Sequence, residues 1–441
     1  MILGNSVLLS VILVFALCVF HVNVVISLTA GALFCGLVDG LTLHNTINIF
    51  SNGLGAGAKI ALSYAILGAF ASAVAHSGLP DLLAEWLIKK IQSSSNSNVG
   101  FTKYMFFLSI GLMAIACKNV IPVHIAFIPI LIPPLLKVFN FMKIDRRAFA
   151  CIITCGLIVS YMIIPVGFGE IFLDNIMRNH LSINGLEVNL NEVVSALKFP
   201  AIAMVCGVFI SLFRYRKHRI YQNKPDIAPI DKSIAKSPQA IIASISAILV
   251  ALVIQLVTRE VILSALAGFF VFLCLGIVCR SESEKVVSDG FKMMAGISFT
   301  MLAAAGFSGV IHATNGISVL INWLAQCVGD SRVLAVVGML SVGFLISVGI
   351  GSCFSTIPIV ATVYVPLCLK LGFSPATTII IVAVSGICGD AGSPASDSTL
   401  GPTMGLNADG QHNHISDTVL PAFMHITVPA FLCGIICALV L

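Results

Sequence analysis

Between two strongly apolar segments, the chain reads Gly389-Asp390-Ala391-Gly392-Ser393-Pro394-Ala395-Ser396-Asp397-Ser398-Thr399. Two carboxylates and four hydroxyls stand here, where an ordinary membrane helix carries none. A charged side chain near the middle of a bilayer is costly, so it usually marks the path of an ion or a substrate. The glycines and the proline predict a broken helix, whose free backbone groups an ion can satisfy and lipid cannot. The alternative is a polar loop just outside the bilayer.

The composition of the whole chain is that of a multi-pass membrane protein. The 441 residues are 58% hydrophobic and 10% charged, with a mean hydropathy of +1.05. Because about 20 apolar residues span the hydrocarbon core, the chain holds many candidate spans and leaves little room for a soluble domain. It contains no P-loop pattern. Its net charge is a modest +5, and its basic residues cluster in loops. We therefore expect no enzyme activity, no cofactor beyond a coupling ion, and no nucleic-acid partner.

The chain is written as two similar halves. Its only tryptophans are Trp86 and Trp323, which lie 237 positions apart (323 − 86). A Ser-x-x-Ala-Gly motif begins at Ser27 and again at Ser264, with the same spacing. One register shared over most of the chain indicates an internal repeat of the kind found in transporters. The predicted parts are a first repeat at 1–213, a basic cytoplasmic linker at 214–237 and a second repeat at 238–441.

Loop charges predict that the two repeats are inverted. The basic loop that begins at Arg214 is placed in the cytoplasm by the positive-inside rule. The loops at 89–90 and 143–147 are basic too, and both reach the cytoplasm only if the halves have opposite orientations. The expected fold is an all-α polytopic membrane protein with five transmembrane helices and a re-entrant hairpin in each repeat. We expect it in the cell (inner) membrane, with both termini outside.

Each repeat contains a predicted hairpin with a polar tip. The apolar segment Tyr104–Lys137 is interrupted at 117–124, and the segment Leu334–Lys370 is interrupted at 349–358. The orientation of the flanking loops requires each segment to return to the side from which it entered. We therefore predict re-entrant hairpins whose tips lie at membrane depth.

A broken helix follows each hairpin. The interruptions fall at 165–170 and at 389–399, and they align through Pro165 and Pro394 at a spacing of 229 (394 − 165). Two tips and two breaks, brought together by inverted symmetry, form a cavity at the middle of the membrane, where transporters bind substrate and ions. A channel also uses broken helices, but halves of different chemistry favour alternating access. An intramembrane hydrolase has only Ser308–His312 as a candidate pair, at a helix end.

The candidate ligands of this cavity are oxygen-bearing and charged side chains. Hard cations such as sodium bind carboxylate, hydroxyl and carbonyl oxygens. The candidate ion-binding residues are Asp390, Ser393, Ser396, Asp397 and Thr399. The candidate substrate-binding residues are Lys118, Asn119, His124, Glu170, Ser352, Ser355 and Thr356. Lys118 is open to three interpretations: an internal cation, a partner for a substrate carboxylate, or a lysine that snorkels to the cytoplasmic surface.

One further polar run lies beyond the second break. It reads Asp409-Gly410-Gln411-His412-Asn413-His414, which looks like a metal-binding loop. The run is short and has no further ligands near it. We interpret it as a solvated cytoplasmic loop, and we expect no metal site other than one for an alkali cation.

The residues of the second break resemble a known family signature. Gly389-Asp390-x-x-Ser393-Pro394-x-Ser396-Asp397-Ser398-Thr399 is similar to the Gly-Asp-x-x-Ser-Pro-x-Ser-Asp-Thr-Thr motif of NhaC-like sodium/proton antiporters. The inverted architecture also resembles the wider ion transporter superfamily. The resemblance implies that Asp390, Ser393 and Asp397 line an ion site, that a transport domain moves against a scaffold, and that the protein is a homodimer.

Two departures from that signature keep two functions open. Ser398 stands where the family has its first threonine, and the tail from Gly405 to His412 resembles the YuiF-like branch. Members of that branch are suspected of carrying amino acids, histidine among them. The resemblance thus implies either sodium/proton antiport or sodium- or proton-coupled amino-acid transport.

Overall fold

The computed structural model describes most of the chain. The described residues are 4–20, 22–79, 82, 99–119, 124–166, 168–222, 238–258, 260–317, 319–320, 323, 326 and 331–441. Within these ranges the regular structure is helical, with no β-strand. The first part contains α1 (Ser6–Val19), α2 (Val24–Val38), α3 (Leu43–His76), α5 (Val99–Asn119), α6 (His124–Phe141), α7 (Arg146–Ile163), α8 (Phe168–Glu170), the π-helix η2 (Ile171–Arg178), α9 (Asn179–Ile183) and α10 (Leu190–Arg214). The second part contains α11 (Pro238–Thr258), α12 (Val261–Cys274), α13 (Arg280–Ala313), α15 (Arg332–Ile350), α16 (Cys353–Lys370), α17 (Pro375–Gly392), α18 (Asp397–Leu406), η3 (His414–Val419), α19 (Leu420–Ala422), η4 (Phe423–Thr427) and α20 (Val428–Val440).

Helix length and composition make this a multi-pass membrane protein. Among the described residues, eight helices are long and apolar enough to cross a membrane, or up to nine if the bent α13 counts as one span. The prediction of an all-helical membrane protein is therefore confirmed. The inversion of the repeats and the membrane depth of the hairpins stay predictions. The linker also stays a prediction, because residues 223–237 lie outside the described residues.

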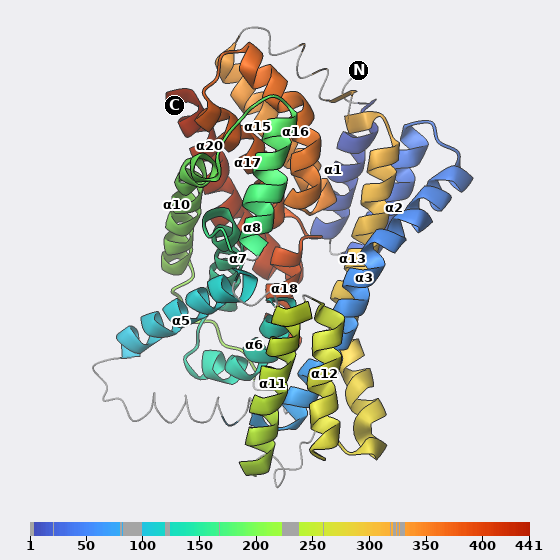
Figure 1. Cartoon of the computed structure of the whole chain (residues 1–441), viewed down its shortest axis with the longest axis vertical. Helices are drawn as coiled ribbons and strands as arrows, with labels where there is room; N and C mark the ends of the chain where they lie inside the picture. Colours follow the sequence, from blue (N-terminus) through green and yellow to red (C-terminus); the bar gives the residue numbers. More distant parts are fainter. Residues whose placement is uncertain are drawn as a thin grey trace.

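The two longest helices, α3 and α13, pack against each other as an antiparallel pair of 34 residues each (Figure 1). Their contacts run in opposite directions, since Gly53 meets Gly306 near one end and Gly68 meets Gly290 further along. A Cβ atom on Gly68 would lie 2.3 Å from the Gly290 carbonyl oxygen. Only glycine permits this approach, which is how membrane helices gain packing contacts in the absence of a hydrophobic drive.

Helices α15 and α16 form an antiparallel hairpin, and α17 packs along it (Figure 1). The open ends of the hairpin lie together, because Arg332 donates to the Leu371 carbonyl oxygen at 3.3 Å. Halfway along, the Tyr364 hydroxyl donates to the Met339 carbonyl oxygen at 2.8 Å. The tip turns at Gly351, whose φ of +73° lies in the left-handed region that favours glycine. The chain thus reverses where the tip was predicted, beside the end of α17. Each arm is long enough to cross a membrane, so the re-entrant path of this hairpin stays a prediction.

Among the candidate membrane spans of the described residues, the broken unit α17–α18 is the most enclosed. In its most apolar stretch 94% of the residues are buried, against 28% in that of α11. Figure 1 places α18 between the upper group of helices (α15, α16, α17) and the lower group (α6, α11, α12). Ser396, Ser398 and Thr399 of this unit are enclosed by protein. That the run lies within the bilayer stays a prediction.

Both interruptions in this repeat are shorter than the sequence suggested. Helix α17 continues through Asp390 to Gly392, and only residues 393–396 are non-helical before α18 begins. The hairpin tip is confined to Gly351 and Ser352, since α16 starts at Cys353 and includes Pro358. The interruption was predicted to begin at Gly389, but this residue lies within α17. A Cβ there would lie 1.9 Å from Ser347 Oγ, so this glycine serves close helix packing.

Candidate functional site

The buried carboxylate of Asp390 is the centre of the candidate site. Asp390 lies in the last turn of α17 and is only 3% exposed. The Tyr161 hydroxyl donates to its Oδ2 at 2.7 Å, and the Cys353 backbone N–H donates to its Oδ1 at 2.9 Å. A buried charge needs such donors, because it has lost its water. Three elements, α7, α16 and α17, therefore meet at one carboxylate.

The Cys353 amide belongs to the first residue of α16. The first amides of a helix have no partner within the helix, and the helix dipole favours negative charge there. The short turn explains this geometry. The chain reverses at Gly351, and the next helix begins directly after it, with its free amides beside α17. The hairpin tip therefore places a helix N-terminus against the Asp390 carboxylate.

An aromatic cluster surrounds the Tyr161 end of this contact. The Tyr161 ring lies 4.7 Å from that of Phe172 and 6.0 Å from that of Phe168, centroid to centroid. Phe168 in turn lies 4.7 Å from Phe354, the second residue of α16. Tyr161 itself is fully buried. These rings shield the Asp390 side of the site and join α8 and η2 to the hairpin tip.

The four residues of the break are held by hydroxyl-to-backbone hydrogen bonds. Ser393 Oγ donates to the Val348 carbonyl oxygen at 2.8 Å, which ties the break to α15. Thr399 Oγ1 lies 2.8 Å from the Ser393 carbonyl oxygen and 3.0 Å from that of Ser396. Backbone groups freed by a break are satisfied in this way when lipid surrounds the protein. The hydroxyls predicted as ion ligands thus also stabilise the break.

Asp397 faces a different part of the molecule from Asp390. It is the first residue of α18, partly exposed, and accepts a hydrogen bond from Ser398 Oγ at 3.3 Å. Its charge acts on Tyr64 of α3, and Leu400 one turn later packs with Tyr64 and Met294. The structure therefore places the two predicted carboxylates on the two sides of the break.

The predicted substrate-binding residues divide into three groups. Ser352, Ser355 and Thr356 lie at the start of α16, within one helical turn of the Cys353 amide that binds Asp390. Thr356 Oγ1 donates to the Ser352 carbonyl oxygen at 2.9 Å. Glu170 is exposed on α8. The side chains of Lys118, Asn119 and His124 lie outside the described residues.

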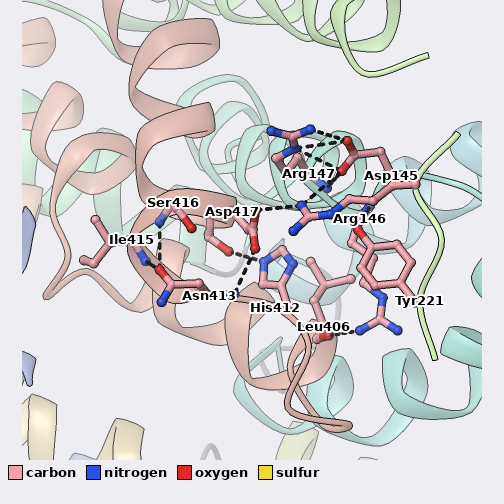
Figure 2. A network of polar contacts seen from close by, with 12 residues as sticks. Asp145, Arg146, Arg147, Tyr221, Leu406, His412, Asn413, Ile415, Ser416 and Asp417 are labelled. Carbon is pink, nitrogen blue, oxygen red and sulfur yellow. Dashed lines mark hydrogen bonds and ion pairs between the residues drawn. The ribbon is translucent and has the colours of Figure 1, made fainter. Parts of the chain in front are cut away.

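A second buried polar cluster, which sequence reasoning missed, joins α7 to the chain after α18 (Figure 2). We call it the linker network; its members are Asp145, Arg146, Arg147, Arg219, Tyr221, Asp409, His412 and Asp417. Arg146 is fully buried and donates to both carboxylate oxygens of Asp409, at 2.7 Å from Nη1 and 2.5 Å from Nη2. The Tyr221 ring lies 4.1 Å from the same guanidinium. Two charges are thereby paired in a bidentate geometry.

The linker network also fixes the run Asp409–His414. Arg219, at the start of the linker, donates to Asp417 at 2.8 Å, and His412 is 2% exposed with its Nε2 2.7 Å from Thr418 Oγ1. Burial lowers the pKa of His412 to about 3, with the charges of Arg146 and Arg219 acting in the same direction against that of Asp417. The prediction of a solvated loop is therefore wrong for His412.

His414 connects this network to the break. Its Nε2 lies 2.8 Å from the Pro394 carbonyl oxygen, and its Nδ1 lies 2.8 Å from Thr403 Oγ1. Since a carbonyl only accepts, the ring carries a proton on Nε2. No group of three or more His, Cys, Asp or Glu side chains within the described ranges has the arrangement of a metal site.

Helical composition and a buried carboxylate beside a broken helix define a polytopic membrane transporter. Residues 152–435 match the Na+/H+ antiporter family, and residues 5–91 match a second family described as Na+-H+ antiporter. The chain belongs to the Na+/H+ antiporter family. The resemblance inferred from the 389–399 motif is confirmed.

Three relatives match along their whole length. An uncharacterized membrane protein of Vibrio parahaemolyticus is 49% identical, over 99% of this chain and 100% of its own. One of Haemophilus influenzae is 45% identical, over all of both chains. YuiF of Bacillus subtilis, named as a candidate amino acid transporter, is 45% identical over 99% of this chain and 100% of its own.

Two solved transporters show distant likeness. The YdaH transporter of Alcanivorax borkumensis is 16% identical, with a TM-score of 0.40 over 90% of this chain and 87% of that one. MtrF of Neisseria gonorrhoeae, described as illuminating a class of antimetabolite efflux pumps, is 13% identical, with a TM-score of 0.37 over 90% of this chain and 85% of that one. At these values neither fold is carried over to this chain.

Proposed function

We propose that the protein is a secondary active transporter of the cell (inner) membrane, coupled to sodium or protons, in which Asp390 binds the coupling ion. The observation that carries this proposal is the carboxylate itself: 3% exposed, at the end of a broken helix, and held by donors from α7 and α16. A buried ionisable group in a membrane helix is a functional site by default. The resident hydrogen-bond donors are a hydroxyl and an amide, and they stabilise the charge without supplying a cation.

Sodium and a proton compete for one carboxylate in this scheme. A proton neutralises Asp390 directly, whereas sodium needs further oxygens. The break supplies carbonyl and hydroxyl oxygens from Ser393, Ser396 and Thr399, and Asp397 lies at its far end. We propose alternating access between two inverted repeats, a homodimer, and both termini outside.

The second candidate function is the coupled transport of an amino acid. It is favoured by the likeness to YuiF, which is named for amino acid transport and is 45% identical over almost the whole chain. The hydroxyls of Ser352, Ser355 and Thr356 at the hairpin tip offer donors for a substrate carboxylate. Lys118 is proposed as its cationic partner.

Purified protein in liposomes tests both versions. An internal pH dye reports proton flux when sodium is added, and labelled amino acids, histidine first, report organic cargo with and without a sodium gradient. Sodium-driven proton flux without cargo supports antiport and contradicts amino-acid transport. Sodium- or proton-driven uptake of one amino acid supports the second function and contradicts pure antiport. Uncoupled flux contradicts both.

A further inference from the structure

The hydrogen bond between Tyr161 and Asp390 joins the two halves of the chain at a closed polar triangle. The Tyr161 hydroxyl donates to Asp390 Oδ2 at 2.7 Å, and Cys353 supplies its amide to Oδ1 and its thiol to the Tyr161 oxygen at 3.6 Å. Tyr161 is fully buried and Asp390 is 3% exposed. Both side chains are therefore shielded from bulk water where they meet.

The position of Tyr161 in the repeat register is unusual. The two helix breaks align through Pro165 and Pro394 at a spacing of 229, and the Tyr161–Asp390 pair has the same separation of 229. The tyrosine therefore stands at the position in the first repeat that the aspartate occupies in the second. If the repeats are inverted as predicted, a residue that touches its own counterpart lies on the two-fold axis that relates them.

We propose that Tyr161 is the positioning residue of the Asp390 ion site and keeps this contact in both the inward-open and the outward-open state. The proposal rests on the proposed function. In a transporter with inverted repeats, the two end states differ by an exchange of conformation between the repeats. Exchange maps the Tyr161–Asp390 contact onto itself, so it is present on both sides of the transport cycle.

A neighbouring contact behaves differently under the same exchange. Thr154 Oγ1 donates to the Ser398 carbonyl oxygen at 3.0 Å, between α7 and α18. Shifted by 229, these positions become Ala383 and Gly169, which are a different pair of residues. The exchange therefore does not require the Thr154 hydrogen bond in both states, whereas it requires the Tyr161 contact in both.

The chemical role of Tyr161 follows from the direction of its hydrogen bond. A donor to a carboxylate favours the ionised form, which is the form that binds a cation. The titratable groups around Asp390 include Tyr161 from α7 and Cys388 on its own helix, and the thiol of Cys353 from α16 acts on Tyr161. Of these, Tyr161 donates its O–H to the carboxylate at 2.7 Å.

Infrared titration of the solubilised protein tests the positioning role without any transport assay. The band of protonated Asp390 is assigned by its loss in Asp390→Asn. In Tyr161→Phe, which keeps the ring among Phe168 and Phe172, we expect the band to titrate about one pH unit higher, a roughly tenfold gain in proton affinity. The matched control is Tyr364→Phe, another fully buried tyrosine whose hydroxyl donates at 2.8 Å to a backbone oxygen. Equal titration in wild type and Tyr161→Phe overturns the proposal.

Vesicles of opposite orientation test whether the contact exists in both states. We expect Tyr161→Phe to raise the KM for sodium at acidic pH by the same factor, about tenfold, from either face, and to approach wild type at alkaline pH. A change from one face only overturns the two-state claim. If the wild-type protein shows neither sodium- nor proton-coupled flux, the proposed function fails, while the infrared titration still decides whether Tyr161 sets the proton affinity of Asp390.

Discussion

The Asp390 site and the linker network are both buried and polar, yet they treat charge in opposite ways. Asp390 receives hydrogen bonds from a tyrosine hydroxyl and a helix amide, which stabilise a negative charge without cancelling it. Arg146 is paired with Asp409 through two short hydrogen bonds, so that its charge is cancelled in place. In the proposed function, a proton or sodium neutralises the charge that donors of the first kind stabilise. A bidentate ion pair of the second kind holds two segments together.

The largest effect expected from this contrast is the loss of transport in Asp390→Asn. The amide removes the charge that a coupling ion neutralises but keeps the size and one acceptor of the side chain. We expect coupled flux in proteoliposomes to fall by a factor on the order of 100 or more, as for the loss of an essential group, with folding unchanged.

A carboxylate on the surface serves as the control for that substitution. Asp289 in α13 is exposed and pairs with Lys292 at 3.2 Å. Asp289→Asn is expected to transport at the wild-type rate. Full activity of Asp390→Asn would exclude Asp390 as the residue that binds the coupling ion.

Breaking the linker network is expected to affect stability and not ion affinity. Asp409→Asn leaves the fully buried guanidinium of Arg146 without its anionic partner, which costs about 3–5 kcal/mol. Thermal or chaotrope unfolding in detergent measures this loss. The control is Asp174→Asn, which removes an exposed ion pair to Arg178 and costs about 0–1 kcal/mol. Equal losses in the two variants would mean that the buried pair is no stronger than a surface one.

Acid is expected to weaken the same network through His412. Its pKa is about 3 in the folded protein against an ordinary value of 6.5, so the unfolded chain binds a proton that the folded chain refuses. Stability from this group is complete above pH 6.5 and falls by about 1.4 kcal/mol per pH unit between 6.5 and 3. Burial raises the pKa of Asp409, but the opposing effect of Arg146 leaves it below the ordinary value of 3.8. The stability that Asp409 contributes is therefore lost only below pH 3.8.

Substitution of His412 separates this acid sensitivity from other causes. His412→Gln retains a polar atom near Thr418 Oγ1 and removes the titration, so unfolding measured from pH 7 to 4 is expected to show a shallower slope than wild type. His218 is exposed at the start of the linker, and His218→Gln should leave the slope unchanged. An unaltered slope in His412→Gln would assign the acid effect to another group.

Sequence reasoning reached the Asp390 region because its signals are local. A run of carboxylates, hydroxyls and glycines in an apolar segment is visible without a structure, and the family motif covers the same residues. Tyr161 carried no such signal, because a single tyrosine in an apolar helix resembles ordinary core. The sequence signal that could have found it is the repeat spacing of 229, which also separates it from Asp390.

The linker network was missed for a related reason. Arg146 lies in a basic cluster that reads as a cytoplasmic loop, and its partner Asp409 is 263 positions away. Charge patterns predict the side of the membrane on which a loop lies, but not which distant loop it meets. The extent of each break also escaped prediction, since glycines at close helix contacts look the same in a sequence as glycines at turns.

The smallest expected effect concerns the hydrogen bonds that hold the break. Thr399→Val keeps the shape of the side chain but removes the hydroxyl that bonds to the Ser393 and Ser396 carbonyl oxygens, so we expect a loss of about 1–3 kcal/mol. Thr362→Val is the control, because this exposed threonine bonds only to the Ile359 carbonyl oxygen of its own helix among the contacts described. If Thr399 is purely structural, the KM for sodium is unchanged in both variants, although Thr399→Val is less stable. If its oxygen is an ion ligand, Thr399→Val raises the KM for sodium as well, and a double substitution with Tyr161→Phe shows whether the two ends of the site act independently.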